Sequence, residues 1–171
     1  FEAIGKRAIW LGLNLITAFV AAASIDIFRD TIEKVVILAV LMPIVASMGG
    51  VAATQTLTIM VRGMALGQIN RTNLGWLISR ETIVGLANGF LWAAVVGLIA
   101  SFWFNDIIIA QIIAIAMIFN LLVGVISGVT VPSILKYFKI DPGIAGSVIV
   151  TTITDVSGFI CFLGLASLYY G

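Results

Sequence analysis

Five long apolar stretches, separated by short charged or polar segments, constrain this chain more than any other feature of its sequence. Each is about as long as the roughly 20 residues that an α-helix needs to cross the hydrocarbon core of a bilayer. Backbone polar groups in lipid must be satisfied inside the segment, so such stretches form helices. We predict an all-α, polytopic membrane domain with transmembrane helices at about residues 6–24, 33–62, 75–104, 107–138 and 142–170.

Composition leaves little room for a water-soluble part. Of the 171 residues, 61% are hydrophobic and 10% are charged, whereas roughly a quarter of an average soluble domain is charged. We therefore predict that residues 1–171 form a single transmembrane domain in a lipid bilayer. The chain opens on Phe1 and its first apolar stretch is as long as a full span, so we expect a fragment of a longer protein rather than a signal peptide.

Several functional classes are excluded by what the sequence lacks. A net charge of +1 without a basic run offers nucleic acid no electrostatic footprint. The sequence has no histidine and one cysteine, Cys161, which excludes a disulfide and a Cys-based metal site and removes the commonest catalytic base. No paired intramembrane acids and no serine with a base at helical spacing are present, so we do not expect an enzyme. Any bound metal must have oxygen ligands.

Positive charge is distributed unequally between the two ends of the predicted helices. If the N-terminus is cytoplasmic, only Arg29 and Lys34 lie outside, and the inner ends collect Lys6, Arg7, Arg62, Arg71, Arg80, Lys136 and Lys139. Lys and Arg are enriched on cytoplasmic loops. We therefore predict a multi-pass protein of the cell membrane, with a cytoplasmic N-terminus and an extracytoplasmic C-terminus. Asp141 and Pro142 supply a start signal for the last helix, as a cap and a first helical residue.

Asp155 is the only ionisable side chain that the sequence places deep in the hydrocarbon. A carboxylate at the middle of a span costs roughly 2.5–3.5 kcal/mol on insertion scales, so such residues normally face a cavity or a partner. No Lys or Arg lies at comparable depth in the predicted spans. Water, a cation or a protonated, hydrogen-bonded carboxyl group remain as compensation, and we favour an ion pathway.

Small and polar residues follow one face of the last predicted helix and one face of the second. On the last helix, at 100° per residue, they are Gly143, Ser147, Thr151, Thr154, Asp155 and Gly158. On the second they are Ser47, Gly50, Thr54 and Thr58, with Gln55 to one side. Helix packing explains the glycines but not Asp155.

Two further polar features leave alternatives open. Pro43 and the pair Gly49-Gly50 loosen the second helix and free carbonyl groups, which suits either a cavity lining or a bend made for packing. On the fourth helix Asn120, Gly124 and Ser127 share a face, which fits interhelical hydrogen bonding as well as pore lining.

In a symmetric dimer, Asp155 could form an ion site together with its copy in the second chain. A two-fold dimer with the last helix at its axis brings two copies of Asp155 together. Two carboxylates match a divalent cation, and Mg2+ is typically bound through one or two carboxylates while it keeps several waters. The hydroxyl groups of Thr151 and Thr154 could hydrogen-bond that water shell. Spacing alone does not choose Mg2+ over Ca2+ or Mn2+.

Four segments of the sequence carry a family resemblance. They are the stretch from Pro43 through Gly49, Gly50, Thr54 and Gln55 to Arg62, the segment Phe119-Asn120 to Gly124, the pair Asp141-Pro142, and Thr151-Thr152-Ile153-Thr154-Asp155-Val156-Ser157-Gly158-Phe159. Together they resemble the membrane domain of the MgtE family of magnesium channels, over essentially the whole chain. The last segment is the most specific.

The resemblance implies a homodimeric, five-helix Mg2+ channel of a bacterial inner membrane, whose pore lies at the subunit interface between the second and fifth helices. Asp155 matches the ion-binding aspartate, and Thr151 matches the position whose backbone carbonyl faces the hydrated ion. The pore-lining candidates are Ser47, Gly50, Thr54, Gln55, Thr58, Ser147, Thr154 and Gly158. The family's N-terminal cytoplasmic regulatory region is absent from these 171 residues.

The sequence also departs from the family pattern. Val51 stands where relatives usually have Asn, and Ala53 where they usually have Gly. Two other functions remain open at this point. One is a carrier that couples a divalent cation to H+ or Na+, and the other is a non-transporting membrane scaffold subunit in which Asp155 is a dimer contact.

Overall fold

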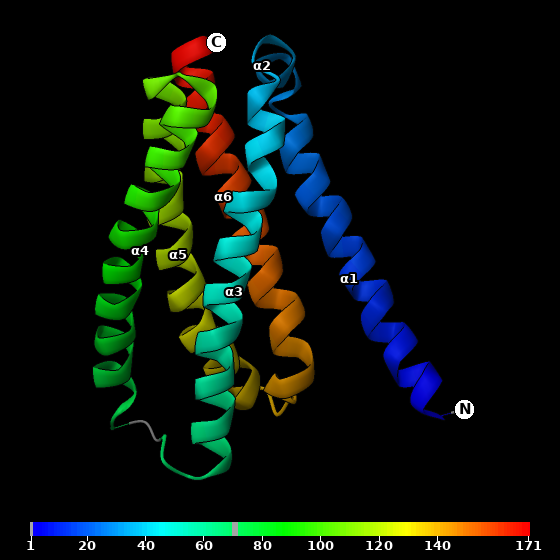
Figure 1. The fold of residues 1–171 in the computed structure, drawn as a ribbon. Helices are drawn as coiled ribbons and strands as arrows, with labels where there is room; N and C mark the ends of the chain where they lie inside the picture. The colour runs from blue at the N-terminus through cyan, green and yellow to red at the C-terminus, as the bar shows by residue number, and fades with distance from the viewer. Residues whose placement is uncertain (1, 70–71) are drawn as a thin grey trace.

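The computed structural model describes residues 2–69 and 72–171, all of whose regular structure is helical (Figure 1). In chain order the helices are α1 (Glu2–Asp26), α2 (Arg29–Lys34), α3 (Ile37–Ala65), α4 (Leu74–Phe104), α5 (Ile107–Tyr137) and α6 (Pro142–Tyr170). Within the described residues, α1, α3, α4, α5 and α6 are long and apolar enough to cross a membrane. The predicted fold class of five transmembrane helices is therefore confirmed.

The long helices run alternately up and down, so the two termini lie at opposite ends of the bundle (Figure 1). The central helix is α5, against which α3, α4 and α6 all pack. In contrast, α1 meets the bundle near its upper end and leans away from it toward the N-terminus (Figure 1). Most large apolar side chains of α1 are exposed, among them Phe19 at 68%, as expected for a surface that lipid covers.

One predicted boundary is wrong. The sequence predicts a single helix over residues 33–62, but the structure has the short helix α2 followed by a break, and α3 starts at Ile37. Val35 ends α2 with a non-helical backbone, at φ −129° and ψ 80°. The break lets α2 fold onto α6 at the upper end of the bundle, whereas a continuous helix would project beyond that end.

The connection between the predicted spans 33–62 and 75–104 is also shorter in the structure, since α3 continues to Ala65 and α4 begins at Leu74; the arginines nearest to it are Arg62 and Arg80. Both arginines lie inside helices, Arg62 in α3 and Arg80 in α4. Helix continuation satisfies backbone groups near the membrane surface without help from water. Long side chains such as arginine can still reach the interface from there.

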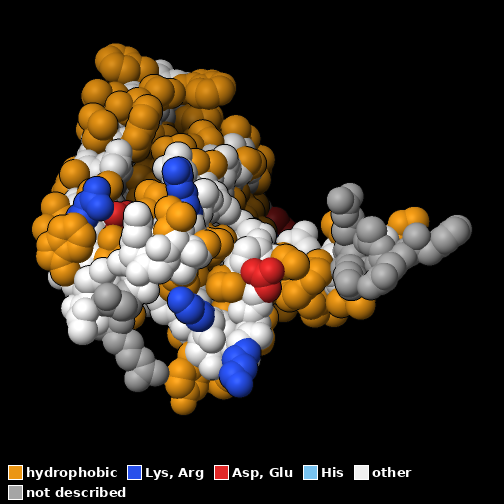
Figure 2. All heavy atoms as spheres, turned by 90° about the horizontal axis from the view of Figure 1, so that it is seen from below, with side chains coloured by type: hydrophobic (Ala, Val, Ile, Leu, Met, Phe, Trp, Pro, Cys, Tyr) orange, Lys and Arg blue, Asp and Glu red, His pale blue; other side chains and the backbone are white. Residues whose placement is uncertain are grey.

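The two ends of the bundle differ in charge. Figure 2, seen from below, shows Lys and Arg side chains gathered at the lower end; the described basic residues of that end are Arg62, Arg80, Lys136 and Lys139. The upper end carries Asp26, Arg29, Asp30, Glu33, Lys34 and Asp106. The remaining basic residues predicted at the lower end are Lys6, Arg7 and Arg71; the side chains of the first two, and all of Arg71, lie outside the described residues.

Side-chain caps start the two C-terminal helices. Asp141 accepts a hydrogen bond from Gly143 N at 2.8 Å and Pro142 opens α6, so the predicted capping role of Asp141 is confirmed. At the upper end, Asn105 ends α4 in the left-handed conformation, at φ 51°. Asp106 then caps α5, because its Oδ1 accepts hydrogen bonds from the next free backbone N–H groups.

Asp106→Ala should lower the stability of the chain by about 1–2 kcal/mol. The substitution removes the acceptor of Ile108 N at 2.8 Å and of Ile109 N at 3.2 Å, and it removes the acceptor of the Tyr170 hydroxyl at 3.2 Å. Tyr170→Phe is the matched control, since it deletes only the last bond and should cost about half as much. The midpoint of unfolding in detergent checks both; equal midpoints for the two variants would mean that the cap contributes nothing.

Candidate functional site

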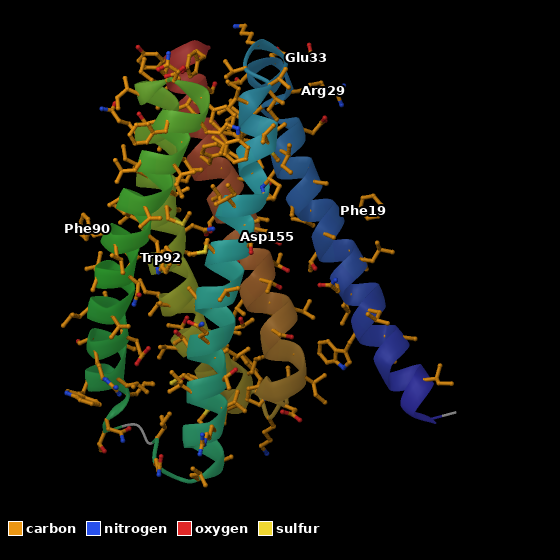
Figure 3. The ribbon with its side chains drawn as sticks, viewed as in Figure 1. Phe19, Arg29, Glu33, Phe90, Trp92 and Asp155 are labelled. Atoms are coloured by element: carbon orange, nitrogen blue, oxygen red, sulfur yellow. The ribbon has the colours of Figure 1, made fainter. Side chains whose placement is uncertain are left out.

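Asp155 lies near the middle of α6, about 20 Å from the start of that helix at 1.5 Å per residue. Figure 3 labels it at mid-height of the bundle, where α3 and α6 lie side by side. The residue is partly buried, and no hydrogen bond or ion pair joins its carboxylate to any other described residue. The described Lys and Arg side chains belong to the two ends of the bundle, so none of them compensates this charge.

Close contacts fix how α3 and α6 run past one another. A Cβ atom added at Gly50 would lie 3.8 Å from Thr151 Cγ2, and one at Gly146 would lie 2.8 Å from Leu57 Cδ1. The two helices therefore meet in antiparallel register, with small residues at the points of closest approach. Such residues let membrane helices approach closely.

This register aligns the two polar stripes that the sequence analysis found separately. Because the two helices are antiparallel, residue numbers increase toward the upper end in α6 and decrease toward it in α3. Counting from the Gly50–Thr151 contact therefore places Ser47 level with Asp155, and Thr54 level with Ser147. Ser47 is exposed and the other three are partly buried. The structure thus brings these residues into one polar seam along the contact between α3 and α6, with Asp155 as its charge.

Hydroxyl groups of the seam already donate their protons within their own helices. Thr54 Oγ1 donates to Gly50 O at 2.9 Å, and Thr151 Oγ1 donates to Ser147 O at 2.7 Å. Thr58 Oγ1 donates in the same way to Thr54 O at 2.8 Å. A hydroxyl oxygen that has donated still has acceptor lone pairs. The seam therefore presents acceptors, which suit a cation or the water protons around one.

Three of the predicted pore-lining residues lie elsewhere. Thr154 is 0% exposed and donates to Thr151 O at 3.0 Å, and Gly158 is buried against Asn120. Both lie inside the chain, away from any surface where a second copy could complete a pore. Gln55 lines a groove on a different side of α3. The sequence does not show where α5 covers α6, so it could not separate Thr154 and Gly158 from the more open residues of the same stripe.

The sequence left open whether Asn120 forms hydrogen bonds between helices or lines a pore. In the structure Asn120 packs between three helices, which favours the first. It is 0% exposed, and its Nδ2 donates to Val45 O in α3 at 2.7 Å. A Cβ at Gly158 would lie 2.6 Å from Asn120 Nδ2, and one at Gly49 would lie 2.6 Å from its Cγ. These glycines leave room for the amide, which joins α3, α5 and α6 just above the level of Asp155. Asn120 Oδ1 has no hydrogen-bond partner among the described residues.

Glu81 is an intramembrane acid that the sequence analysis missed. It lies in α4, about 10 Å from the start of the helix, and is 6% exposed. Asp155 is therefore not the only carboxylate held away from water. A signal was present in the sequence, because Glu81 falls at four-residue spacing in a stripe of buried residues, Leu77, Glu81, Gly85, Gly89 and Ala93.

Asp155 has no second ionisable ligand near it in the part of the chain that the structure describes. No group of three or more His, Cys, Asp or Glu side chains lies close enough together there to hold a metal ion. Asp155 with its hydroxyl neighbours is a half-site, which needs either water or a second chain to surround a cation.

Comparison with known proteins gives a consistent family match. A family model described as "MgtE: Divalent cation transporter" matches residues 42–165. The chain is 28% identical over 169 residues to the magnesium transporter MgtE of Bacillus subtilis (strain 168), an alignment that covers 99% of this chain and 38% of the relative. It is 26% identical to the magnesium transporter MgtE of Enterococcus faecalis (strain ATCC 700802 / V583), covering 98% of this chain and 37% of that protein. The chain thus spans less than two fifths of the length of these curated relatives.

Proposed function

This chain belongs to the MgtE family of divalent cation transporters, and we propose that it forms the pore of a Mg2+ channel. Two copies pair about a two-fold axis, and the α3–α6 seam of each lines the pore between them. The observation that carries the proposal is Asp155, an unpaired carboxylate at mid-height of the seam. Mg2+ is the proposed ion because the relatives are named magnesium transporters.

The charge of the proposed site fits its ion. Two Asp155 carboxylates balance a divalent cation, and Mg2+ keeps several of its waters when carboxylates bind it. Those waters donate hydrogen bonds to the hydroxyl oxygens of Ser47, Thr54, Thr58 and Ser147 and to the backbone carbonyl of Thr151. Thr154, Gly158 and Gln55 are left out of the lining, because the first two are buried within the chain and the third lies in another groove.

The proposed topology follows from the charged ends of the bundle. The lower end, with Arg62, Arg80, Lys136 and Lys139, faces the cytoplasm, because positive residues are retained on that side. The N-terminus is then cytoplasmic and the C-terminus extracytoplasmic, in the inner membrane of a bacterium. The whole span of residues 1–171 acts as a single ion-conducting domain.

Flux into proteoliposomes tests the function and separates a channel from a coupled carrier. With an inward Mg2+ gradient and no gradient of H+ or Na+, a Mg2+-sensitive dye inside the vesicles should report uptake that increases when the interior is made negative. Ca2+, Mn2+ and Co2+, tested in the same way, give the selectivity. Uptake that requires an opposing H+ or Na+ gradient would replace the channel by a carrier, and vesicles no leakier than protein-free ones would refute both.

A further inference from the structure

A groove between α3 and α4 lies away from the α3–α6 seam. Helices α3 and α4 both pack on α5 but hardly touch one another, which leaves a groove of about 390 Å3 between them. Leu121 and Val125 of α5 line it, as do Met48, Val51 and Ile59 of α3 and Val84 and Trp92 of α4. Trp92, labelled in Figure 3, lies toward the upper part of this groove.

Four polar residues face each other across these apolar walls. Gln55 and Thr56 come from α3, and Glu81 and Asn88 come from α4. The Asn88 side-chain nitrogen donates to Val84 O at 3.0 Å, which leaves its amide oxygen free to accept. Amide and hydroxyl oxygens together with a carboxylate are the ligand types that hard cations prefer.

Glu81 carries the only formal charge among the residues that line the groove. Its carboxylate makes no hydrogen bond or ion pair with any other residue that the structure describes, although the residue is only 6% exposed. Removing an ion from water without a partner carries a penalty of several kcal/mol. Intramembrane acids are therefore normally paired, or face a water-filled cavity or an ion.

The nearby arginines do not supply that partner. Arg80 stacks on Trp76, with its guanidinium carbon 5.7 Å from the ring centroid. Arg62 and Arg80 both line a neighbouring pocket at the lower end of the bundle, where both are exposed, and neither lies within ion-pair distance of Glu81.

We propose that the groove between α3 and α4 is a second cation-binding site, in which Glu81 supplies the charge and Gln55, Thr56 and Asn88 supply neutral oxygens. Six water molecules at about 30 Å3 each occupy about 180 Å3, so a cation with its first hydration shell fits within 390 Å3. The site is complete within one chain, so it does not rest on the dimer or on the proposed pore. Each chain holds one such site, whereas the Asp155 site is shared between two chains.

Mn2+ binding to the purified 171-residue chain in detergent tests this assignment. Electron paramagnetic resonance counts the free Mn2+, and Mg2+ is added as the competitor. Asp155→Asn should still bind one Mn2+ per chain, and Asp155→Asn combined with Glu81→Gln should bind it at least tenfold more weakly. If Asp155→Asn binds no Mn2+, or if the added Glu81→Gln changes nothing, the groove is not a cation site.

Two further variants test whether a loss of Mn2+ binding comes from misfolding, and whether an arginine of the chain is the partner of Glu81. Asn88→Leu on the Asp155→Asn background keeps the acid but removes a neutral oxygen, and it should weaken Mn2+ binding several-fold. Arg62→Gln on the same background should leave the stoichiometry at one Mn2+ per chain. If Mn2+ binds only after Arg62 is removed, Arg62 is the partner of Glu81 and the proposal is overturned.

Discussion

Asp155→Asn should reduce Mg2+ flux through the reconstituted chain at least tenfold, equivalent to about 1.4 kcal/mol or more in the barrier. The substitution keeps the size of the side chain and removes the only charge at mid-height of the α3–α6 seam. A cation loses much of its hydration energy at that depth, and a fixed negative charge in a region of low dielectric offsets part of the loss. In the proposed dimer a single substitution removes both charges, which enlarges the effect.

Ser157→Ala is the matched control for this substitution. Ser157 lies two residues from Asp155 but lines an apolar groove beside Phe119, on another side of α6. Its hydroxyl donates to Ile153 O at 2.6 Å, so the helix itself uses it. Flux through Ser157→Ala should therefore match that of the unchanged chain. A comparable loss in both variants would show that flux depends on α6 packing rather than on the carboxylate.

Stability measurements separate a lost ion site from a lost fold. A carboxylate at mid-span costs roughly 2.5–3.5 kcal/mol on insertion scales, so Asp155→Asn should unfold at the same midpoint as the unchanged chain or at a higher one. Reduced flux together with undiminished stability identifies Asp155 as functional. Full flux together with weaker dimerisation would instead support the scaffold hypothesis, in which Asp155 is a dimer contact.

Gly128→Ala should destabilise the packing of α3 on α5 by about 2–3 kcal/mol, near the upper end of the usual range for overpacking. The new Cβ would lie 2.7 Å from Ala53 O and 2.7 Å from Thr56 Cβ. A backbone oxygen and a β-carbon cannot move aside unless α3 itself moves. Because α3 carries half of the polar seam, flux should fall together with stability, unlike in Asp155→Asn.

Gly12→Ala is the control for adding a methyl group to a membrane helix. Apart from the neighbouring backbone of α1 itself, no atom of the described residues lies within 4 Å of a Cβ at Gly12. Alanine is a better helix former than glycine by up to about 1 kcal/mol, so this variant should be neutral or slightly stabilised. Melting curves in detergent micelles compare the two. Equal midpoints for Gly128→Ala and the unchanged chain would contradict the close approach of α3 and α5.

The sequence alone predicted the number of spans, the depth of Asp155 and the cap at Asp141. These are local properties. The number of spans follows from the length of each apolar run, because the thickness of the bilayer is fixed. The cap follows from the residues at the helix start, because a capping side chain reaches only the first turn of its own helix. The break at Val35 was missed, since nothing in the apolar run that follows marks the point where the helix restarts.

Only the tertiary structure decided which faces of the helices are covered. Thr154 and Thr151 belong to the same polar stripe, yet one is fully buried and the other is partly open. Glu81 was missed, although it falls within the predicted span 75–104, because its burial beside a groove depends on how far apart α3 and α4 stand on α5. Helical periodicity predicts which residues share a face of one helix, but not which other helix packs against that face. The packing depends on contacts between residues far apart in the chain, such as Gly128 against Ala53.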